Sequence, residues 1–445
     1  MTTWWCEYAL IGGAVEHGVT VRTAHGRFTS VEANTAPAIE ASRLSGLTVP
    51  GFANTHSHAF HRALRSRVQA ERGTFWTWRE IMYRAAERLN PDNYHRLARA
   101  VFAEMAVAGM TVVGEFHYVH HQIDGTPYDS PNVMGEALLA AASEAGIRIT
   151  LLDALYLHGG LEAEGHVAPS GAQLRYRDTD AHRWAERVGR LSDGDRHRIG
   201  AAIHSVRAVN PDSMQVVSAW ASQRDAPLHA HVSEQRAEND RSVHHYGRTP
   251  TALLELVGAL ETNFTAVHAT HLTDHDLELL ATNRCSVCMC PTTERDLGDG
   301  IGLTSELVAK GVPLSLGSDS HAVIDQMAEA RAVELNERLR SEKRGTHSAT
   351  ELMHMATTAG HRSLGWDDAG AIAVGLRADL VTIGLDSERL AGAASDLLIE
   401  AAVFASTTSD ITSVIVDGEA LVSGGNHVHI DVAAELQATI EELLS

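Results

Sequence analysis

Short apolar runs alternate with helical patterns along most of this chain, and this alternation restricts the possible folds more than any other feature of the sequence. Each run is rich in β-branched or small apolar residues, as expected of strands that are buried on both faces. The segments between the runs carry apolar residues at i, i+3 and i+4, which is helical spacing. This order predicts an α/β fold, the (β/α)8 TIM barrel. The eight runs are 47–54, 110–116, 148–155, 198–205, 227–232, 264–269, 285–290 and 313–319, and the helical segments include 96–108, 133–145, 213–223, 250–259 and 325–339.

The two ends of the chain have a different pattern from the middle. Residues 1–47 and 371–445 contain short strands punctuated by glycine, and we expect both to build one small β-sandwich beside a catalytic barrel of residues 48–370. A chain of 445 residues is long enough for these two parts. The last stretch has Leu436 and Leu443 on one helical face, which predicts a C-terminal helix packed against the body of the protein or against a partner subunit.

The charge of the chain excludes several classes of partner. A formal charge of −21 lacks the basic footprint of proteins that bind nucleic acid or anionic membranes. The first residues have neither the cationic start nor the apolar core of a signal peptide, and no run of about 18 apolar residues indicates a membrane span. We therefore expect a cytoplasmic protein, a homodimer, whose partner is a small molecule.

Two segments have more than one interpretation. The run CSVCMC at 285–290 contains C-x-x-C, a motif of redox and zinc sites, but no second C-x-x-C or nearby histidine pair completes a zinc site. We interpret its cysteines as buried small side chains in a strand. Residues 156–197 form a long segment rich in glycine, histidine and charge, which is either a lid or binding loop or a surface excursion without function.

Histidine and aspartate stand at the ends of four predicted strands. His56 and His58 follow the first run as H-S-H, and three further groups, His231, His268 and Asp319, end the fifth, sixth and eighth runs. The carboxyl ends of barrel strands converge on one mouth, where active sites of this fold lie. Imidazole and carboxylate suit Zn²⁺ or another borderline divalent ion. A single such histidine can be a hydrogen-bonded core residue, but five groups at four strand ends predict a metal centre.

The motifs around these residues resemble the amidohydrolase superfamily over essentially the whole chain. The resemblance implies a barrel enzyme with a flanking sandwich, whose metal is held by His56, His58, His231 and Asp319. The motifs that carry it are PGFANTHSH at 50–58, HAHVSE at 229–234, VHATH at 267–271 and LGSDSH at 316–321.

The same resemblance implies the catalytic groups. Glu234 matches a glutamate that moves a proton between the attacking water and the leaving nitrogen, a role that a carboxyl near the attacked carbon can perform. The alternative for Glu234 is a carboxylate at a helix N-terminus that stabilises the helix dipole. His268 would donate or accept a hydrogen bond with the attacking water, and Asp319 would both bind metal and help to deprotonate that water.

The lysines bear on the number of metals. Binuclear members of the superfamily bridge their metals with a carboxylated lysine at the end of a barrel strand. This chain has two lysines, Lys310 in a helix–loop segment before the eighth strand and Lys343 in a charged helical stretch. Neither position is the carboxyl end of a strand, so we expect one divalent metal ion per chain, with Zn²⁺ as the first expectation.

Longer segments resemble the formimidoylglutamate deiminase family in particular. The resemblance implies hydrolysis of N-formimidoyl-L-glutamate to N-formyl-L-glutamate and ammonia, a step of histidine degradation. The segments are HSHAFHRAL at 56–64, FWTWREIMYR at 75–84, EFHYVHH at 115–121, HSVRAV at 204–209, HVSEQ at 231–235 and PTTERDLGDGI at 291–301.

A dicarboxylate substrate requires fixed cations in a chain of this charge, and arginine suits carboxylates because its planar fork donates two parallel hydrogen bonds. The resemblance points to Arg79 and Arg207, with Tyr118, His204 and His61 lining the pocket. Independently of the resemblance, Arg207 is expected to face the barrel mouth, because it stands three residues after His204 at the end of the fourth strand. For Arg79 the alternative role is a surface ion pair. The family generally has glutamine where His61 stands, which changes the polar contacts around the substrate.

Two other functions stay open. A deaminase of a nucleobase or related heterocycle would share every metal residue but would require aromatic stacking and amide contacts in place of arginines. A barrel kept only as a scaffold would have lost its ligands, whereas this sequence retains all of them.

Overall fold

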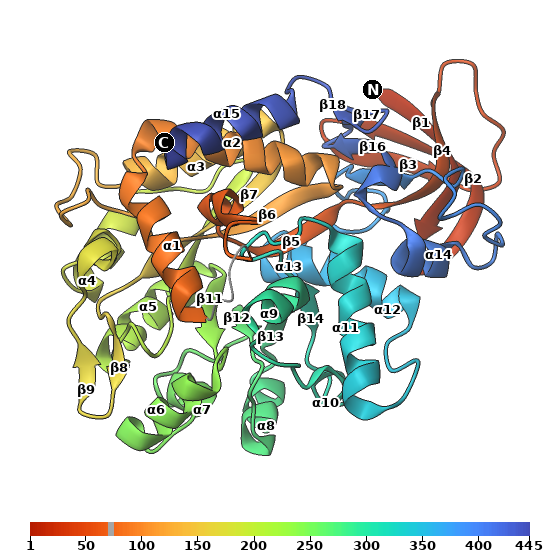
Figure 1. Cartoon of the computed structure of the whole chain (residues 1–445). Coiled ribbons are helices and arrows are strands. Elements are labelled where there is room, and N and C mark those ends of the chain that lie inside the picture. The colour runs from red at the N-terminus through yellow and green to blue at the C-terminus, as the bar shows by residue number, and fades with distance from the viewer. Residues whose placement is uncertain (70–74) are drawn as a thin grey trace.

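Eight parallel strands form a nearly closed barrel in the computed structural model, which describes residues 1–69 and 75–445 (Figure 1). They are β5 (Phe52–Ser57), β6 (Met110–His117), β7 (Arg148–Leu155), β10 (His197–Ile203), β11 (Leu228–Val232), β12 (Phe264–His268), β13 (Ser286–Met289) and β14 (Leu314–Leu316). Hydrogen bonds join them in the order β14-β13-β12-β11-β10-β7-β6-β5, and a bridge between Ser57 and Asp319 links the two edges. The prediction of a (β/α)8 barrel is confirmed.

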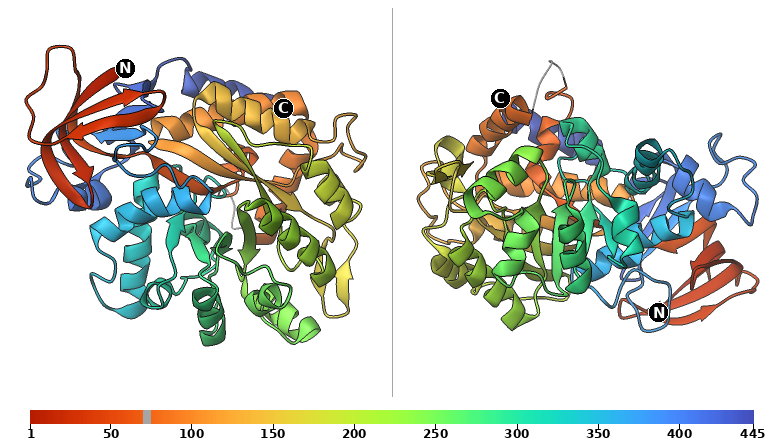
Figure 2. Two further views of the ribbon diagram at one scale, coloured as in Figure 1. Left: turned by 180° about the vertical axis from the view of Figure 1, so that it is seen from behind. Right: turned by 90° about the horizontal axis from the view of Figure 1, so that it is seen from below.

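Helices follow the barrel strands and cover the outside of the barrel (Figure 2). They are α1 (Phe75–Arg88), α2 (Pro91–Val107), α3 (Val133–Ala145), α4 (Ala181–Val188), α5 (Pro211–Arg224), α6 (Arg236–Tyr246), α7 (Pro250–Leu256), α8 (Asp274–Thr282), α9 (Pro291–Leu297), α10 (Thr304–Ala309), α11 (Gln326–Ser341), α12 (Ala349–His354), α13 (Gly360–Ser363), α14 (Leu398–Ala405) and α15 (Val432–Leu444), with shorter turns η1 (Ala59–Leu64), η2 (Gly171–Arg175), η3 (Met355–Ala359) and η4 (Thr408–Asp410). Within the described residues, no helix has both the length and the apolar character that crossing a membrane requires.

Three of these helices begin with the same local signal. Asn90, Asn210 and Thr249 each stand before a proline, and their side chains accept backbone N–H groups of the first turn of α2, α5 and α7. Proline at the first helical position has no N–H that needs a partner, so the pair of a capping residue and proline fixes where the helix begins.

Both ends of the chain contribute to one flanking sheet, as predicted. Its strands are β1 (Thr2–Ile11), β2 (Ala14–Ala24), β3 (Arg27–Glu32), β4 (Ser42–Pro50), β15 (Leu380–Ile383), β16 (Ile411–Val416), β17 (Glu419–Ser423) and β18 (Asn426–His427). They are hydrogen-bonded in the order β18-β17-β16-β15-β4-β1-β2-β3, so that β4 from the N-terminal part lies beside β15 from the C-terminal part.

The chain passes from this sheet into the barrel at Gly51. Because β4 ends at Pro50 and β5 begins at Phe52, the predicted run 47–54 is the junction of two strands rather than one. A Cβ atom at Gly51 would lie 2.3 Å from Thr111 Oγ1, so glycine alone fits this passage. Both strands are buried here, and a continuous apolar run therefore gives no sign of the boundary.

The segment 156–197 is more regular than a loop. It contains a hairpin of β8 (Gly160–Glu162) and β9 (Gly165–Val167), the turn η2 and the helix α4, which follows the third barrel strand. The sequence AHRWAERV of α4 is short and mostly polar, and only its buried face with Trp184 packs on the barrel. Periodicity over eight residues is too brief to reveal such a helix.

Two smaller predictions concern buried side chains. Helix α15 lies along α2, where Leu436 and Leu443 are buried, so it packs against the body of the protein (Figure 1). Cys285, Cys288 and Cys290 are free and buried in and around β13, which confirms their interpretation as small side chains of a strand.

Candidate active site

A cavity of about 340 Å³ opens at the carboxyl ends of the barrel strands. It is the place where an active site of this fold is expected, because residues distant in sequence converge there. All of the site residues predicted from the sequence line this cavity except His56. The His56 ring contacts the ring of His58 at the base of the cavity. The lining residues among them are His58, His61, Arg79, Tyr118, His204, Arg207, His231, Glu234, His268 and Asp319.

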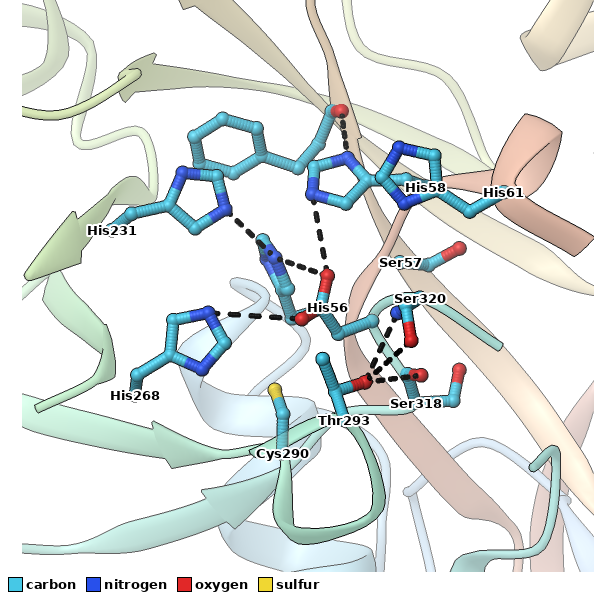
Figure 3. Close-up of polar contacts among 12 residues, drawn as sticks. His56, Ser57, His58, His61, His231, His268, Cys290, Thr293, Ser318 and Ser320 are labelled. Carbon is cyan, nitrogen blue, oxygen red and sulfur yellow. Dashed lines mark hydrogen bonds and ion pairs between the residues drawn. The ribbon is translucent and has the colours of Figure 1, made fainter. Parts of the chain in front are cut away.

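Four side chains at the base of the cavity, here named the metal cluster, are His56, His58, His231 and Asp319. Figure 3 shows the three histidines turned toward one another. His56 Nε2 lies 3.1 Å from His231 Nε2 and 3.5 Å from Asp319 Oδ1. His58 Nε2 lies 3.4 Å from the same aspartate oxygen. Ligand atoms about 2.0 Å from a tetrahedral zinc ion stand about 3.3 Å apart, so this spacing fits one ion of that size.

Backbone carbonyl groups orient two of these histidines. Nδ1 of His58 donates to the Phe116 carbonyl at 2.9 Å, and Nδ1 of His231 donates to the His204 carbonyl at 2.8 Å. A neutral ring that donates from Nδ1 carries its lone pair on Nε2, so two lone pairs face the centre of the cluster. Burial lowers the pKa of His56, His58 and His231, which favours the neutral rings that a metal requires.

The backbone behind the metal cluster is strained. Ser233, His268 and Asp319 have φ values of 51°, 68° and 42°, which non-glycine residues rarely adopt. Each costs about 1–3 kcal/mol and persists where the surrounding structure fixes it, as at functional sites. The H-S-H segment is itself tied to β6, because Ser57 Oγ donates to Glu115 Oε2 at 2.5 Å.

His268 lies between two carboxylates. Its Nδ1 is 3.4 Å from Glu294 Oε1, and its Nε2 is 3.7 Å from Asp319 Oδ2. Burial opposes a charged ring, but the hydrogen bond to Glu294 and the charge of Glu234 raise the pKa of His268 to about 10. Burial alone would raise the pKa of Asp319, and the nearby histidines, His268 foremost, lower it instead. An imidazolium beside a carboxylate can orient a water molecule and share its proton.

Glu234 reaches the cavity beside Arg207. Arg207 Nη2 lies 3.2 Å from Glu234 Oε2, and Arg207 Nε lies 2.8 Å from Glu238 Oε2 on α6. Burial would lower the pKa of Arg207, but Glu238 and Glu234 raise it, so the guanidinium stays charged. The arginine assigned to the substrate in the sequence is thus paired with two glutamates of the protein.

The remaining predicted substrate residues come together on one wall of the cavity. His61 Nε2 lies 2.9 Å from the Tyr118 hydroxyl, and both side chains are buried. Burial and the neighbouring Arg207 hold the pKa of His204 well below its ordinary value. The Arg79 guanidinium lies 5.1 Å from the centre of the Tyr83 ring.

Several residues that line the cavity were not predicted from the sequence. Tyr156 follows the third barrel strand, and its position at a strand end was an available signal. Gln173, whose amide donates to the Tyr156 hydroxyl at 2.8 Å, reaches the cavity only through the turn η2. Arg241 of α6 and Glu162 of β8 form an ion pair at 3.4 Å, a contact that tertiary packing alone brings about.

The comparisons with known proteins agree with this geometry. The model of the amidohydrolase family matches residues 47–421. The chain belongs to the amidohydrolase family. This amidohydrolase is 36% identical over 398 residues to formimidoylglutamate deiminase from Pseudomonas aeruginosa, with 87% of each chain covered. It is 28% identical over 408 residues to a 5-methylthioadenosine/S-adenosylhomocysteine deaminase from Natronomonas pharaonis, which covers 90% of this chain and 87% of the relative. The crystal structure of an amidohydrolase from Brucella melitensis superposes with a TM-score of 0.92 at 32% identity and covers 100% of both chains.

These relatives give the class of reaction. The amidohydrolase is an enzyme of the deaminase type and hydrolyses carbon–nitrogen bonds, as the motifs predicted. Since its relatives differ in substrate, the substrate has to be inferred from the cavity itself.

Proposed function

We propose that this amidohydrolase releases ammonia from N-formimidoyl-L-glutamate. The observation that carries the proposal is that Arg79 and Arg207 line the same small cavity as Glu234 and three members of the metal cluster, His58, His231 and Asp319. In a chain of charge −21, two guanidinium groups beside a hydrolytic centre suit a substrate with two carboxylates. A cavity of about 340 Å³ is near the lower end of the range of about 300–1,000 Å³ for ligand sites, which favours a compact acid over a substituted nucleoside.

One divalent ion, Zn²⁺ in the first instance, would be held by His56, His58, His231 and Asp319, since three imidazoles and a carboxylate are the donors this ion prefers. Lys310 follows α10, precedes β14 and pairs with Glu278, and Lys343 follows α11, so neither stands at the carboxyl end of a barrel strand, where a lysine bridging a second ion would be needed. When bound, the ion lowers the pKa of water and supplies a nucleophile near neutral pH.

Three side chains divide the proton transfers. Asp319 and His268 orient the attacking water toward the formimidoyl carbon. Glu234 accepts the proton that the water loses and delivers it to the terminal nitrogen of the substrate. The bond from carbon to that nitrogen breaks as the hydroxyl that came from water gives its second proton to Asp319, so ammonia leaves and the oxygen of water remains as the formyl oxygen.

The glutamate moiety of the substrate is held through its carboxylates, so its own nitrogen is fixed in position. The terminal nitrogen is the one that can turn toward Glu234 and take the proton. We therefore expect N-formyl-L-glutamate and ammonia, and not formamide and glutamate.

Proton NMR of the reaction tests this proposal. The formyl signal of N-formyl-L-glutamate is expected, together with one ammonia per turnover. Glu234→Gln should lower kcat by about 10²–10⁴-fold, the usual contribution of a positioned proton donor, without changing the metal content. Glu186→Gln is a matched control on the exposed face of α4 and should leave kcat unchanged. Formamide as the main product would contradict both the deiminase reaction and the role of Glu234.

A second candidate is a deaminase of a nucleobase or related heterocycle. The observation in its favour is that aromatic rings, Trp78, Tyr83 and Tyr156, also line the cavity and could stack on a base. An ammonia-release screen over formimidoylated amino acids and nucleobases separates the two. A higher kcat/KM for any nucleobase would favour this second function.

A further inference from the structure

Arg207 lies between two glutamates that differ in their freedom to move. Its Nη2 side contacts Glu234 at 3.2 Å, and its Nε side contacts Glu238 at 2.8 Å. The Glu238 side chain is fully buried, and its Oε1 accepts the Ser233 backbone N–H at 3.1 Å. Glu238 is therefore fixed behind the cavity, whereas Glu234 lines the cavity itself.

This arrangement limits what a substrate carboxylate can do. A guanidinium that already faces two carboxylates cannot bind a third at full strength, because the added anion would meet the charges of the other two. One glutamate has to give up its contact. Glu238 is held by α6 and by the Ser233 N–H, and leaving it unpaired would strand a buried charge. Glu234 is the contact that can be released, since its carboxylate already reaches the cavity.

We propose that Arg207 couples recognition of the substrate carboxylate to release of Glu234 for proton transfer. This inference rests on the proposed function. Arg207, anchored by Glu238, holds Glu234 until a carboxylate of the substrate takes over the Nη2 side of the guanidinium. Glu234 then turns to the reacting carbon and the terminal nitrogen. Arg207 thus acts as a specificity-determining residue: a formamidine without a carboxylate enters the cavity but leaves Glu234 restrained.

The coupling can be separated from simple binding with two substrates. N-formimidoyl-L-glutamate carries the carboxylates, and N-propylformamidine carries the same reacting group without them. If Arg207 only bound substrate, Arg207→Met would weaken the first reaction and leave the second unchanged. With the coupling, Arg207→Met lowers kcat/KM for the dicarboxylate by about 100-fold or more, as for loss of a desolvated charge pair. The same variant raises kcat for the formamidine by about 3- to 10-fold, because Glu234 is no longer held.

A second variant guards against misfolding. Arg207→Met alone leaves Glu238 as a buried unpaired charge, whereas the double variant Arg207→Met/Glu238→Gln removes both charges and keeps an acceptor for the Ser233 N–H. It should show the same gain in kcat on the formamidine. Arg183→Met, on the exposed face of α4, is the matched control and should change neither reaction.

Structure provides an independent readout. A crystal structure with N-formyl-L-glutamate bound should show Arg207 still on Glu238 and separated from Glu234 by more than about 4 Å, the limit of an ion pair.

The outcomes are distinct. An unchanged or lower formamidine rate in both variants, or an intact Arg207–Glu234 contact in the complex, overturns the coupling and leaves the proposed function standing. A wild-type enzyme that hydrolyses the formamidine as fast as the dicarboxylate overturns the proposed function itself.

Discussion

Two buried groups of histidine and aspartate lie on the two sides of the barrel wall, and their residue types are nearly the same. Inside the barrel is the metal cluster. Outside, between the strands and the helices, is a group here named the Arg187 cluster, which consists of His117, His120, Asp153, Asp178 and Arg187. In each group, histidine and aspartate atoms suited to a metal lie within 4.8 Å of one another.

The groups differ in how their charges and lone pairs are already satisfied. Arg187 donates to both oxygens of Asp153 and pairs with Asp178 at 2.9 Å. His120 donates from Nε2 to the Ala154 carbonyl, and its Nδ1 lies 3.3 Å from His117 Nε2. A guanidinium therefore already neutralises the carboxylate that a metal would need. In the metal cluster, the rings of His56, His58 and His231 point toward one another (Figure 3), and Asp319 Oδ1 lies 3.5 Å from His56 Nε2 and 3.4 Å from His58 Nε2.

This difference shows that the residue types of a cluster are not sufficient to make it a metal site. A carboxylate that an arginine has already neutralised gains little from a cation, and a histidine whose two ring nitrogens both have protein partners, as His120 has, offers no lone pair to a metal. Whether a cluster can bind a metal depends on the hydrogen-bond and ion-pair partner of each group, and the tertiary structure determines these partners.

The largest expected effect comes from removing one histidine from each group. His58→Ala should abolish both metal binding and turnover, because it removes one of the proposed ligands and leaves an incomplete cage. His120→Ala is the matched variant of the Arg187 cluster and should retain about one metal per chain, as expected of the wild type. Elemental analysis of both purified variants measures this. If His120→Ala lost its metal, or His58→Ala kept it, the distinction between the groups would be wrong.

A second prediction concerns the arginine. Arg187→Met should lower the free energy of unfolding by about 3–5 kcal/mol, since two buried carboxylates lose their common partner. Urea unfolding of the metal-free protein gives this difference. Arg183→Met, four residues earlier on the exposed face of α4, should cost less than about 1 kcal/mol, as surface ion pairs do. Equal effects of the two variants would show that the Arg187 cluster contributes no special stability.

The smallest expected effect is a pH dependence. Burial lowers the pKa of His120 from 6.5 to about 4. His120 therefore binds a proton near pH 6.5 in the unfolded chain but only near pH 4 in the folded protein. The contribution of neutral His120 to the free energy of unfolding is complete above pH 6.5 and is lost as the pH falls toward 4. Between pH 7 and pH 5 the loss is about 2 kcal/mol. In His120→Gln, measured as metal-free protein by urea unfolding, the loss over this range should shrink by that amount. An unchanged pH dependence would mean that other groups cause it.

Much of the fold was predictable because local sequence patterns indicate its strands and helices. Alternation of apolar runs and helical periodicity gave the barrel, and pairs such as Asn210 with Pro211 mark helix starts. The failures are also local in origin. The junction at Gly51 lies inside a continuous apolar run, and α4 is too short and too polar to show a period.

The candidate site also has features that the sequence predicts and features that it does not. The sequence by itself determined which groups meet at the mouth, because a parallel barrel brings every strand's carboxyl end to one side, and His56, His231 and Asp319 stand at such ends. Only the tertiary structure decided the partners: that Arg207 contacts Glu238 as well as Glu234, and that Arg187 pairs with Asp153 and Asp178 beside the second pair of histidines. Strand ends are a matter of position along the chain, whereas the charge that a buried group meets depends on elements far away in sequence, and no local pattern encodes it.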